Sequence, residues 1–472
     1  MTEISSESMI APGDVVIDEI TLRSYTGFTM SLKGIFHNFI IYENIYSNCM
    51  SGSITIVDSL NLAKHFPVIG AETLTISYKT PMADSKMVRL VFRTYGISVL
   101  SETAQETTQM LRIEFVSHHA IKNIQTRISK SYMNMPVSNM VNSIFDEYLA
   151  IDNDESNGVL NSRMGNERGN LRTLAGASYG LQEETGNIKV RLVSVTETAD
   201  VRSYIIPNWN PVYAINWLAH RARAKTNSSM CDYVFFQNSD GHHFVPLSEL
   251  KLINPAFIYT NYPDGFRSEN GKRMIESELR NIHEYKIEDI SNRITDQTSG
   301  MFGSITMTHD ITNKQWSTTE FNYDDFFQKN KINLEKYPII PTGKLDYTNS
   351  SDSYVSFYPK NSNATIGLNK VHEPEEIIPI RRSLLNQINS INLVVKCFGD
   401  TNVKVGQVIS FRTVSKEATK TIDNYENDYL KGNYLVTTVK HVVEDRSHTM
   451  IMTLSRDSFA EPLADKKNTT IG

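Results

Sequence analysis

The stretch Val68–Ser77, which reads VIGAETLTIS, places a glycine turn before a run of strand-forming residues, and Val403–Phe411, which reads VKVGQVISF, does the same near the other end of the chain. Each stretch is followed by the pattern of a long β-hairpin with a polar turn, over residues 88–117 and 434–455. The sequence therefore predicts two antiparallel β-barrel domains related by internal duplication. The alternative is that two β regions resemble each other because β patterns are repetitive.

The first hairpin contains a long predicted strand. Residues 88–100 would extend about 43 Å at the usual rise per residue, which is long for a closed domain. We expect such an arm to project from its barrel or to pair with a neighbour. A trimer of a chain with two similar barrels would present six similar units around one axis.

Composition excludes several classes of protein. The 472 residues are 40% hydrophobic and carry a formal charge of -6, which fits a globular protein and argues against an electrostatic nucleic-acid binder. The cysteines Cys49, Cys231 and Cys397 are too far apart for a CxxC metal site, and their odd number argues against a disulfide framework. Residues 1–14 lack the apolar core of a signal peptide, and no run approaches the roughly 18 apolar residues of a membrane span. We therefore expect folding in a reducing cytosol and no membrane insertion.

The period of the apolar residues changes along the chain and indicates a mainly β protein with an α+β insert. Helical stripes follow Pro136 over residues 137–148 and Pro211 over residues 212–222. Shorter helices are expected at 59–65, 276–281 and 381–389. The predicted parts are a first barrel at 14–119, an α+β domain at 120–265 with an exposed excursion at 152–186, a second barrel at 266–345 plus 385–459, a polar insertion at 346–384 and a flexible tail at 460–472.

Two histidine pairs and one acidic loop are the candidate metal ligands. For His118-His119 and His242-His243, adjacent residues on a strand would point to opposite faces, so neither pair favours a bidentate site. In the loop after Asp152, Gly158 stands one place late for an EF-hand, and the twelfth position is Arg163 rather than Glu. The sequence predicts no metal site and no cofactor.

Paired carboxylates are the remaining candidates for catalysis. Glu43 with Asp58, or Asp324 with Asp325, has the composition of a glycosidase pair, but acidic residues in β loops are more often solvated. The chain has no P-loop and no HExxH motif. We therefore expect a protein that is not an enzyme. The aromatic cluster at 321–327 is interpreted as core packing, with an interface anchor as the alternative.

Three segments resemble one known family when they are taken in order. Tyr46–Ser59, which reads YSNCMSGSITIVDS, resembles the family's strand and the turn into its helix. Trp209–Ala224 with the following Tyr233–Phe236 resembles a helix and the next strand, and the Val405-Gly406 turn with residues 432–441 resembles the closing strands. Together they are similar to the central baseplate hub proteins of contractile-tailed bacteriophages and related injection machines. The resemblance covers most of residues 14–459, and no single motif in it is specific.

The resemblance implies a structural protein whose two barrels are tail-tube-like. Such a hub is a homotrimer that acts as a symmetry adaptor, joining the hexameric tail tube or a tube-initiator protein to the trimeric central spike. Baseplate wedge proteins would surround it, and DNA would pass through an axial channel. Its place would be the virion tail baseplate, reached from the host cytoplasm during assembly. The alternatives are a tail-tip cell-wall hydrolase and a glycan-binding β protein, and the choice between a phage tail and a phage-derived injection system stays open.

Overall fold

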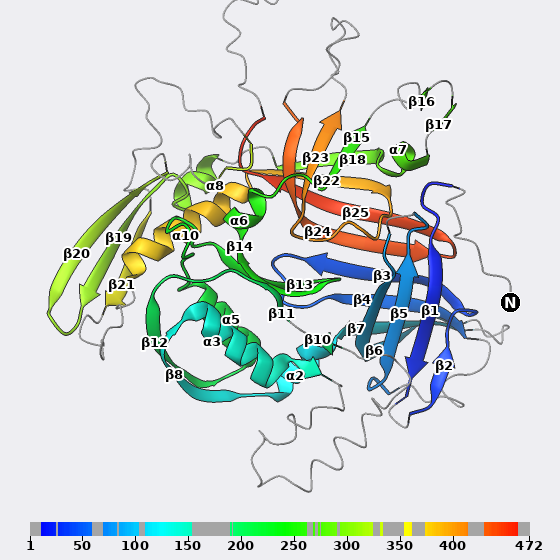
Figure 1. Ribbon diagram of the computed structural model, residues 1–472, viewed down its shortest axis with the longest axis horizontal. Coiled ribbons are helices and arrows are strands. Elements are labelled where there is room, and N and C mark those ends of the chain that lie inside the picture. The colour runs from blue at the N-terminus through cyan, green and yellow to red at the C-terminus, as the bar shows by residue number, and fades with distance from the viewer. Residues whose placement is uncertain are drawn as a thin grey trace, which may run out of the picture.

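The computed structural model describes most of the chain. The described residues are 11–24, 27–58, 69–82, 85–102, 109–152, 189–190, 192–261, 268–269, 272–273, 275–289, 293–323, 331–333, 354–360, 373–413 and 429–460. Figure 1 shows the strands of the N-terminal part, in blue, beside the strands of the C-terminal part, in red. The expected helix at 59–65, most of the excursion at 152–186 and nearly all of the tail at 460–472 lie outside the described residues.

Seven strands from the N-terminal part make a unit that we call the first β-unit. They pair in the order β3-β4-β7-β6-β5-β1-β2, and every pair is antiparallel. Alternating apolar residues such as Ile20 and Leu22, or Ile54 and Ile56, point to one face and form its core. The predicted hairpin is confirmed as β6 and β7. The strands are β1 (Val16–Arg23), β2 (Thr29–Ser31), β3 (Phe36–Asn44), β4 (Ser51–Asp58), β5 (Thr73–Lys79), β6 (Val88–Glu102) and β7 (Gln109–Ser117).

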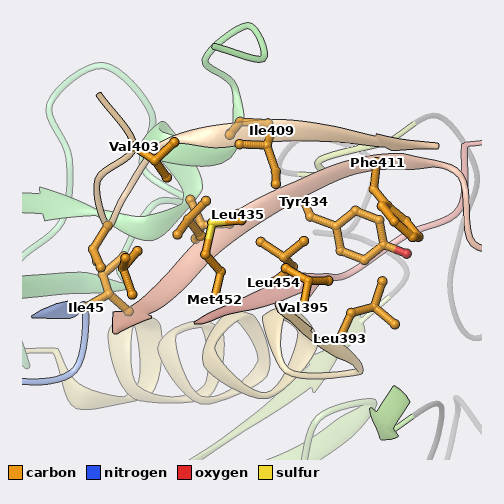
Figure 2. Packing of buried hydrophobic residues seen from close by; sticks show 14 of the residues in the cluster. Ile45, Leu393, Val395, Val403, Ile409, Phe411, Tyr434, Leu435, Met452 and Leu454 are labelled. Atoms are coloured by element: carbon orange, nitrogen blue, oxygen red, sulfur yellow. The ribbon is translucent and has the colours of Figure 1, made fainter. Parts of the chain in front are cut away.

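Six strands, two from the middle of the chain and four from its C-terminal part, make the second β-unit. They pair in the order β18-β22-β25-β24-β23-β15. Figure 2 shows how side chains such as Val395, Leu435 and Leu454 meet in its core. The predicted hairpin is confirmed as β24 and β25. The strands are β15 (Phe257–Asn261), β18 (Ile282–Asp289), β22 (Ile391–Phe398), β23 (Val408–Thr413), β24 (Gly432–Glu444) and β25 (Ser447–Arg456).

The two β-units have the same strand order, because β3-β4-β7-β6-β5-β1 corresponds to β18-β22-β25-β24-β23-β15. The long strands carry a bulge at the equivalent place, between Thr94 and Gly96 in β6 and between Val436 and Thr438 in β24. One pair differs, since β1 is antiparallel to β5 whereas β15 is parallel to β23. The internal duplication agrees with this order and stays a prediction.

The α+β insert follows β7 and has a core of its own. The helices predicted after Pro136 and Pro211 are confirmed, and in the first of them Val137, Met140 and Ile144 are buried as their spacing indicates. The elements are α2 (His118–Gln125), β8 (Ile128–Pro136), α3 (Val137–Ile144), the π-helical turn η1 (Phe145–Leu149), β9 (Ile151–Asp152), β10 (Lys189–Val190), β11 (Leu192–Val195), β12 (Val201–Trp209), α5 (Pro211–Ala219), β13 (Tyr233–Asn238), β14 (Gly241–Pro246) and α6 (Leu247–Lys251).

A three-stranded sheet, β20-β19-β21, lies apart from the main sheet and packs against helix α10 (Figure 1). Two of its strands fall in the range predicted for the second barrel, whereas β15 falls before that range. The domain boundaries themselves stay predictions. The remaining elements are β16 (Ser268–Glu269), β17 (Lys272–Arg273), α7 (Ile275–Leu279), α8 (Arg293–Thr298), β19 (Gly303–Asp310), β20 (Gln315–Asn322), β21 (Val355–Lys360) and α10 (Pro374–Ile388).

Helix α10 begins seven residues before the helix expected at 381–389. Pro379 normally indicates that a helix ends before it, because proline lacks the backbone N–H and clashes with the preceding turn. Here the helix starts at Pro374, a favoured first position, and continues through Pro379. The expected helix is therefore longer, and part of the predicted polar insertion is helical.

Gly52 in β4 tests the packing of the first β-unit. A Cβ at this position would lie 2.1 Å from the carbonyl oxygen of Ile40 and 2.6 Å from the ring of Phe115. We expect Gly52→Ala to lower the free energy of unfolding by about 3 kcal/mol, as overpacking does. Gly34 provides the control, because a Cβ there would meet no heavy atom within 4 Å, and Gly34→Ala should cost less than about 0.5 kcal/mol. Urea unfolding of both variants measures the difference, and equal midpoints would contradict it.

Candidate functional site

The two β-units meet where β3 pairs with β24, and we call this ladder the seam. Its register runs from Asn44 opposite Thr438 to Asn38 opposite Glu444, and it joins both units in one 13-stranded sheet. Side chains cross it, because Val443 of β24 belongs to the core of the first β-unit. The seam therefore fixes how one β-unit lies against the other.

Glu43 closes one end of the seam and also contacts the insert. Its carboxylate accepts hydrogen bonds from the backbone N–H of Ser239 at 3.0 Å and of Val405 at 3.2 Å. Burial raises the pKa of Glu43 to about 7, although these N–H groups and the nearby Lys404 lower it in part. One buried side chain thus ties β3, the β13–β14 turn and the loop before β23 together.

A second contact between the β-units lies in the loops after β5 and β22. Thr80 and Thr401 are both buried and bond reciprocally, each backbone N–H donating to the other's Oγ1 at 3.1 and 3.0 Å. Asn402 Nδ2 also donates to Ser85 Oγ at 2.9 Å. These bonds hold the first β-unit at a point distinct from the seam.

A buried histidine pair joins the seam strand β24 to its other neighbour, β25. His441 Nδ1 of β24 is 3.0 Å from His448 Nε2 of β25, and the edge-on ring of Tyr78 from β5 packs against both. Burial lowers the pKa of His441 to about 4. Burial, and then the neighbouring His441, lower the pKa of His448 further. Both rings are therefore neutral at pH 7, and one donates to the other.

The structure brings together two of the histidines predicted to be unsuited to a metal. The interpretation of His118-His119 as strand residues was wrong, because they begin helix α2. His119 lies across from His242, with ring centroids 4.1 Å apart and nearly perpendicular planes, and its Nε2 is 2.9 Å from the carbonyl oxygen of Asn48. His243 packs instead on Phe236. Within the described ranges, no group of three or more potential ligands surrounds this pair.

The candidate carboxylates do not form a pair. The β3–β4 register places Tyr42 opposite Ser51 and Phe36 opposite Ile56, so Glu43 and Asp58 lie at opposite ends of the two strands. Asp324 and Asp325 lie outside the described residues, as does the loop of the failed EF-hand pattern after Asp152.

The aromatic cluster at 321–327 is buried as far as it is described. Phe321 lies in a small core with residues of α10, and Tyr323 lies in another with Met301 and Phe302, which agrees with the core interpretation. Phe326 and Phe327 lie outside the described residues.

One motif was overlooked in the sequence. Residues 176–180 read GASYG and match the GxSxG pattern that surrounds the nucleophile of α/β-hydrolases. That pattern acts at a turn between a strand and a helix, and this segment lies outside the described residues. Ser178 is therefore a further residue to substitute if a hydrolase assay detects activity.

A cleft of about 600 Å³ separates α5 from α10 and was not predicted. The guanidinium of Arg221 stacks 3.7 Å above the Trp217 ring, and that of Arg382 lies 4.0 Å above Tyr354. Arg381 also lines the cleft, is buried, and donates to the backbone oxygens of Cys231 and Tyr233, so it holds α10 on the insert. Trp217 lies on α5, whereas Arg221 lies two residues beyond the end of this helix, and their spacing of four residues was the only sequence signal.

Comparison with known proteins defines the class of fold. No protein-family model matches the chain. Two solved structures resemble it with a TM-score of 0.50 each: the tail protein from Neisseria meningitidis MC58, 9% identical, with 95% of this chain and 98% of that chain covered, and the 43 kDa tail protein of prophage MuSo2 from Shewanella oneidensis, 8% identical, with 93% and 99% covered. The chain therefore has the fold of these tail proteins, mainly β with an α+β insert, as predicted.

One known protein resembles the chain in sequence over nearly its full length. The chain is 20% identical over 466 residues to the probable baseplate hub protein gp334 of Vibrio phage KVP40, with 94% of each protein covered. The resemblance to baseplate hub proteins that the sequence indicated is thereby confirmed. In the described part of the chain, no helix has both the length and the apolar character required to cross a bilayer.

The histidine pair makes the seam sensitive to acid. A histidine whose folded-state pKa lies below its unfolded value stabilises the fold fully above about pH 6.5, and this stability is lost as the pH falls towards 4. Between pH 7 and pH 4.5, wild type should lose about 2–3 kcal/mol more unfolding free energy than His441→Gln. Urea unfolding across this range measures the difference. The pH dependence of Glu43, which has the opposite sign, is common to both proteins and cancels.

The exposed His37 supplies the matched control for this measurement. Its side chain is 46% exposed and its Nε2 lies 3.7 Å from Oε1 of the exposed Glu444, so His37→Gln removes a surface imidazole and an ion pair of small energy. The slope of its curve should differ from that of wild type far less than the slope for His441→Gln does. A curve for His441→Gln that runs parallel to wild type would contradict the assigned role of the pair.

Proposed function

We propose that the chain is a structural baseplate hub of a phage contractile tail, located in the virion tail baseplate. The observation that carries the proposal is the presence of two β-units with one strand order in a single continuous sheet. The full-length match to a probable baseplate hub protein supports the same function. In this role the protein positions other proteins and performs no chemistry of its own.

The working form of the hub is a homotrimer. Three chains would bring six β-units around one axis, so that a three-fold assembly presents a six-fold face. That face would receive the hexameric tail tube or its initiator, and the other end would hold the trimeric central spike. Wedge proteins would surround the ring, and DNA would pass along its axis. The acidic balance of the chain suits a channel that does not retain DNA.

The solution mass of the purified chain tests this proposal. Light scattering of the protein, alone and mixed with its candidate spike, should give a component near three times 53.6 kDa in at least one sample. A monomer in both samples would contradict the hub function. Peptidoglycan zymography and glycan-binding assays would then address the hydrolase and glycan-binding alternatives.

A further inference from the structure

The two long strands differ in how their distal halves are paired. Beyond its bulge, β24 pairs with β25 along one edge and with β3 along the other, from Thr438 to Glu444. Beyond its own bulge, β6 pairs with β7 along one edge, from Gly96 to Glu102. The pairing of β6 with β5 ends at Arg93. Among the described strands, no ladder continues along that edge of β6.

Equivalent side chains on the two strands are buried to very different extents. Ile97 stands opposite Ile113 of β7 as Val439 stands opposite Met452 of β25, and Val99 is likewise equivalent to His441. Val439 is 1% exposed and His441 3%, whereas Ile97 is 40% exposed and Val99 53%. The distal half of β6 therefore lacks the packing partners that β24 has at the seam, such as Tyr78 of β5 against His441.

Strand β18 holds the complementary position in the second β-unit. It is the end strand beside β22, as β3 is beside β4, so that Tyr285 is equivalent to Phe39 and Ile287 to Ile41. Phe39 and Ile41 are fully buried, whereas Tyr285 and Ile287 are half-buried. The contact of β18 with β15 is at its start, where Asn261 Nδ2 donates to the carbonyl oxygen of Ile282. The rest of β18 has β22 as its described strand partner.

We propose that the distal half of β6 pairs in antiparallel fashion with β18 of a second copy of this chain, in the manner of the seam between β3 and β24. We assign the partner as another copy of this chain because β18 matches the open edge of β6, and the seam between β3 and β24 shows how such strands pair. Three chains closed in this way have three seams within chains and three equivalent seams between chains, with every such edge paired. The inference rests on the trimer of the proposed function and assigns the surfaces that form it.

The seam also supplies the register. His441 stands opposite Ile41, so Val99 of one chain should stand opposite Ile287 of the next. Opposed residues of an antiparallel pair have Cβ atoms about 4.5–5.5 Å apart, which is close enough for a disulfide after a small adjustment. We expect Val99→Cys with Ile287→Cys, in one chain, to form a covalent trimer that is visible on a non-reducing denaturing gel.

The matched control moves one cysteine by a single position. Val99→Cys with Lys286→Cys places the second thiol on the opposite face of β18, so it should not cross-link. The two single variants control for the native Cys49, Cys231 and Cys397. Equal cross-linking of both double variants would overturn the register, and a trimer by light scattering without a cross-link would overturn this seam while leaving the hub function standing. A monomer without a cross-link would overturn both.

A variant that needs no cross-link provides an independent test of the joint between β6 and β18. Ile97→Lys with Val99→Lys places charge on side chains that are exposed in the single chain, so circular dichroism should be unchanged while trimer formation weakens at least a hundredfold. Val201→Lys with Ile205→Lys, at positions 42% and 72% exposed on β12, also adds two lysines to one strand of the insert and should leave the trimer intact. A trimer that survives the double lysine change with unaltered stability would contradict the proposal.

Discussion

The pairing of β3 with β24 is the interaction on which the rest of the structure depends. It joins backbone segments that are roughly 400 residues apart in the chain, and it turns two sets of strands into one sheet. Each strand supplies the partner that the other's edge requires, so neither exposes its N–H and C=O groups there. Glu43 at the end of the seam also accepts hydrogen bonds from the insert and from the loop before β23. This joint therefore positions β3, the insert and the second β-unit relative to one another.

The interior of the joint disfavours charge on its ionisable groups. His441 and His448 are held uncharged by burial, and Glu43 has a pKa near neutrality for the same reason. The two kinds of group change the free energy of unfolding in opposite directions with pH. Below about pH 6.5 the histidines become protonated in the unfolded state, which favours unfolding. Above about pH 4.5 Glu43 ionises in the unfolded state, which also favours unfolding. The charged side chains of the seam region, such as Lys440 over Tyr42, lie instead on its outer face.

The sequence predicts the local elements well and the long-range contacts poorly. The hairpins at 88–117 and 434–455 and the helices after Pro136 and Pro211 depend on alternation, helical spacing and turn residues, which are all local signals. The partner of β3 is set by packing between distant segments, so no local pattern identifies β24. The contact of His119 with His242 arises in the same way. Glu43 was noticed only as half of a carboxylate pair, because its burial follows from where β3, the insert and the second β-unit meet.

The long arm of β6 shows how a local signal acquires meaning from the fold. Its length was predicted to make it project or pair with a neighbour, and the structure leaves Ile97 and Val99 exposed where Val439 and His441 are covered. An internal seam forms at the high effective concentration that the covalent chain provides, whereas an equivalent joint between chains depends on protein concentration. The seam within the chain is therefore permanent, whereas the proposed joint between β6 and β18 of two chains would depend on protein concentration. A chain built from two like units in this way can fold alone and still carry the edges that assembly would close.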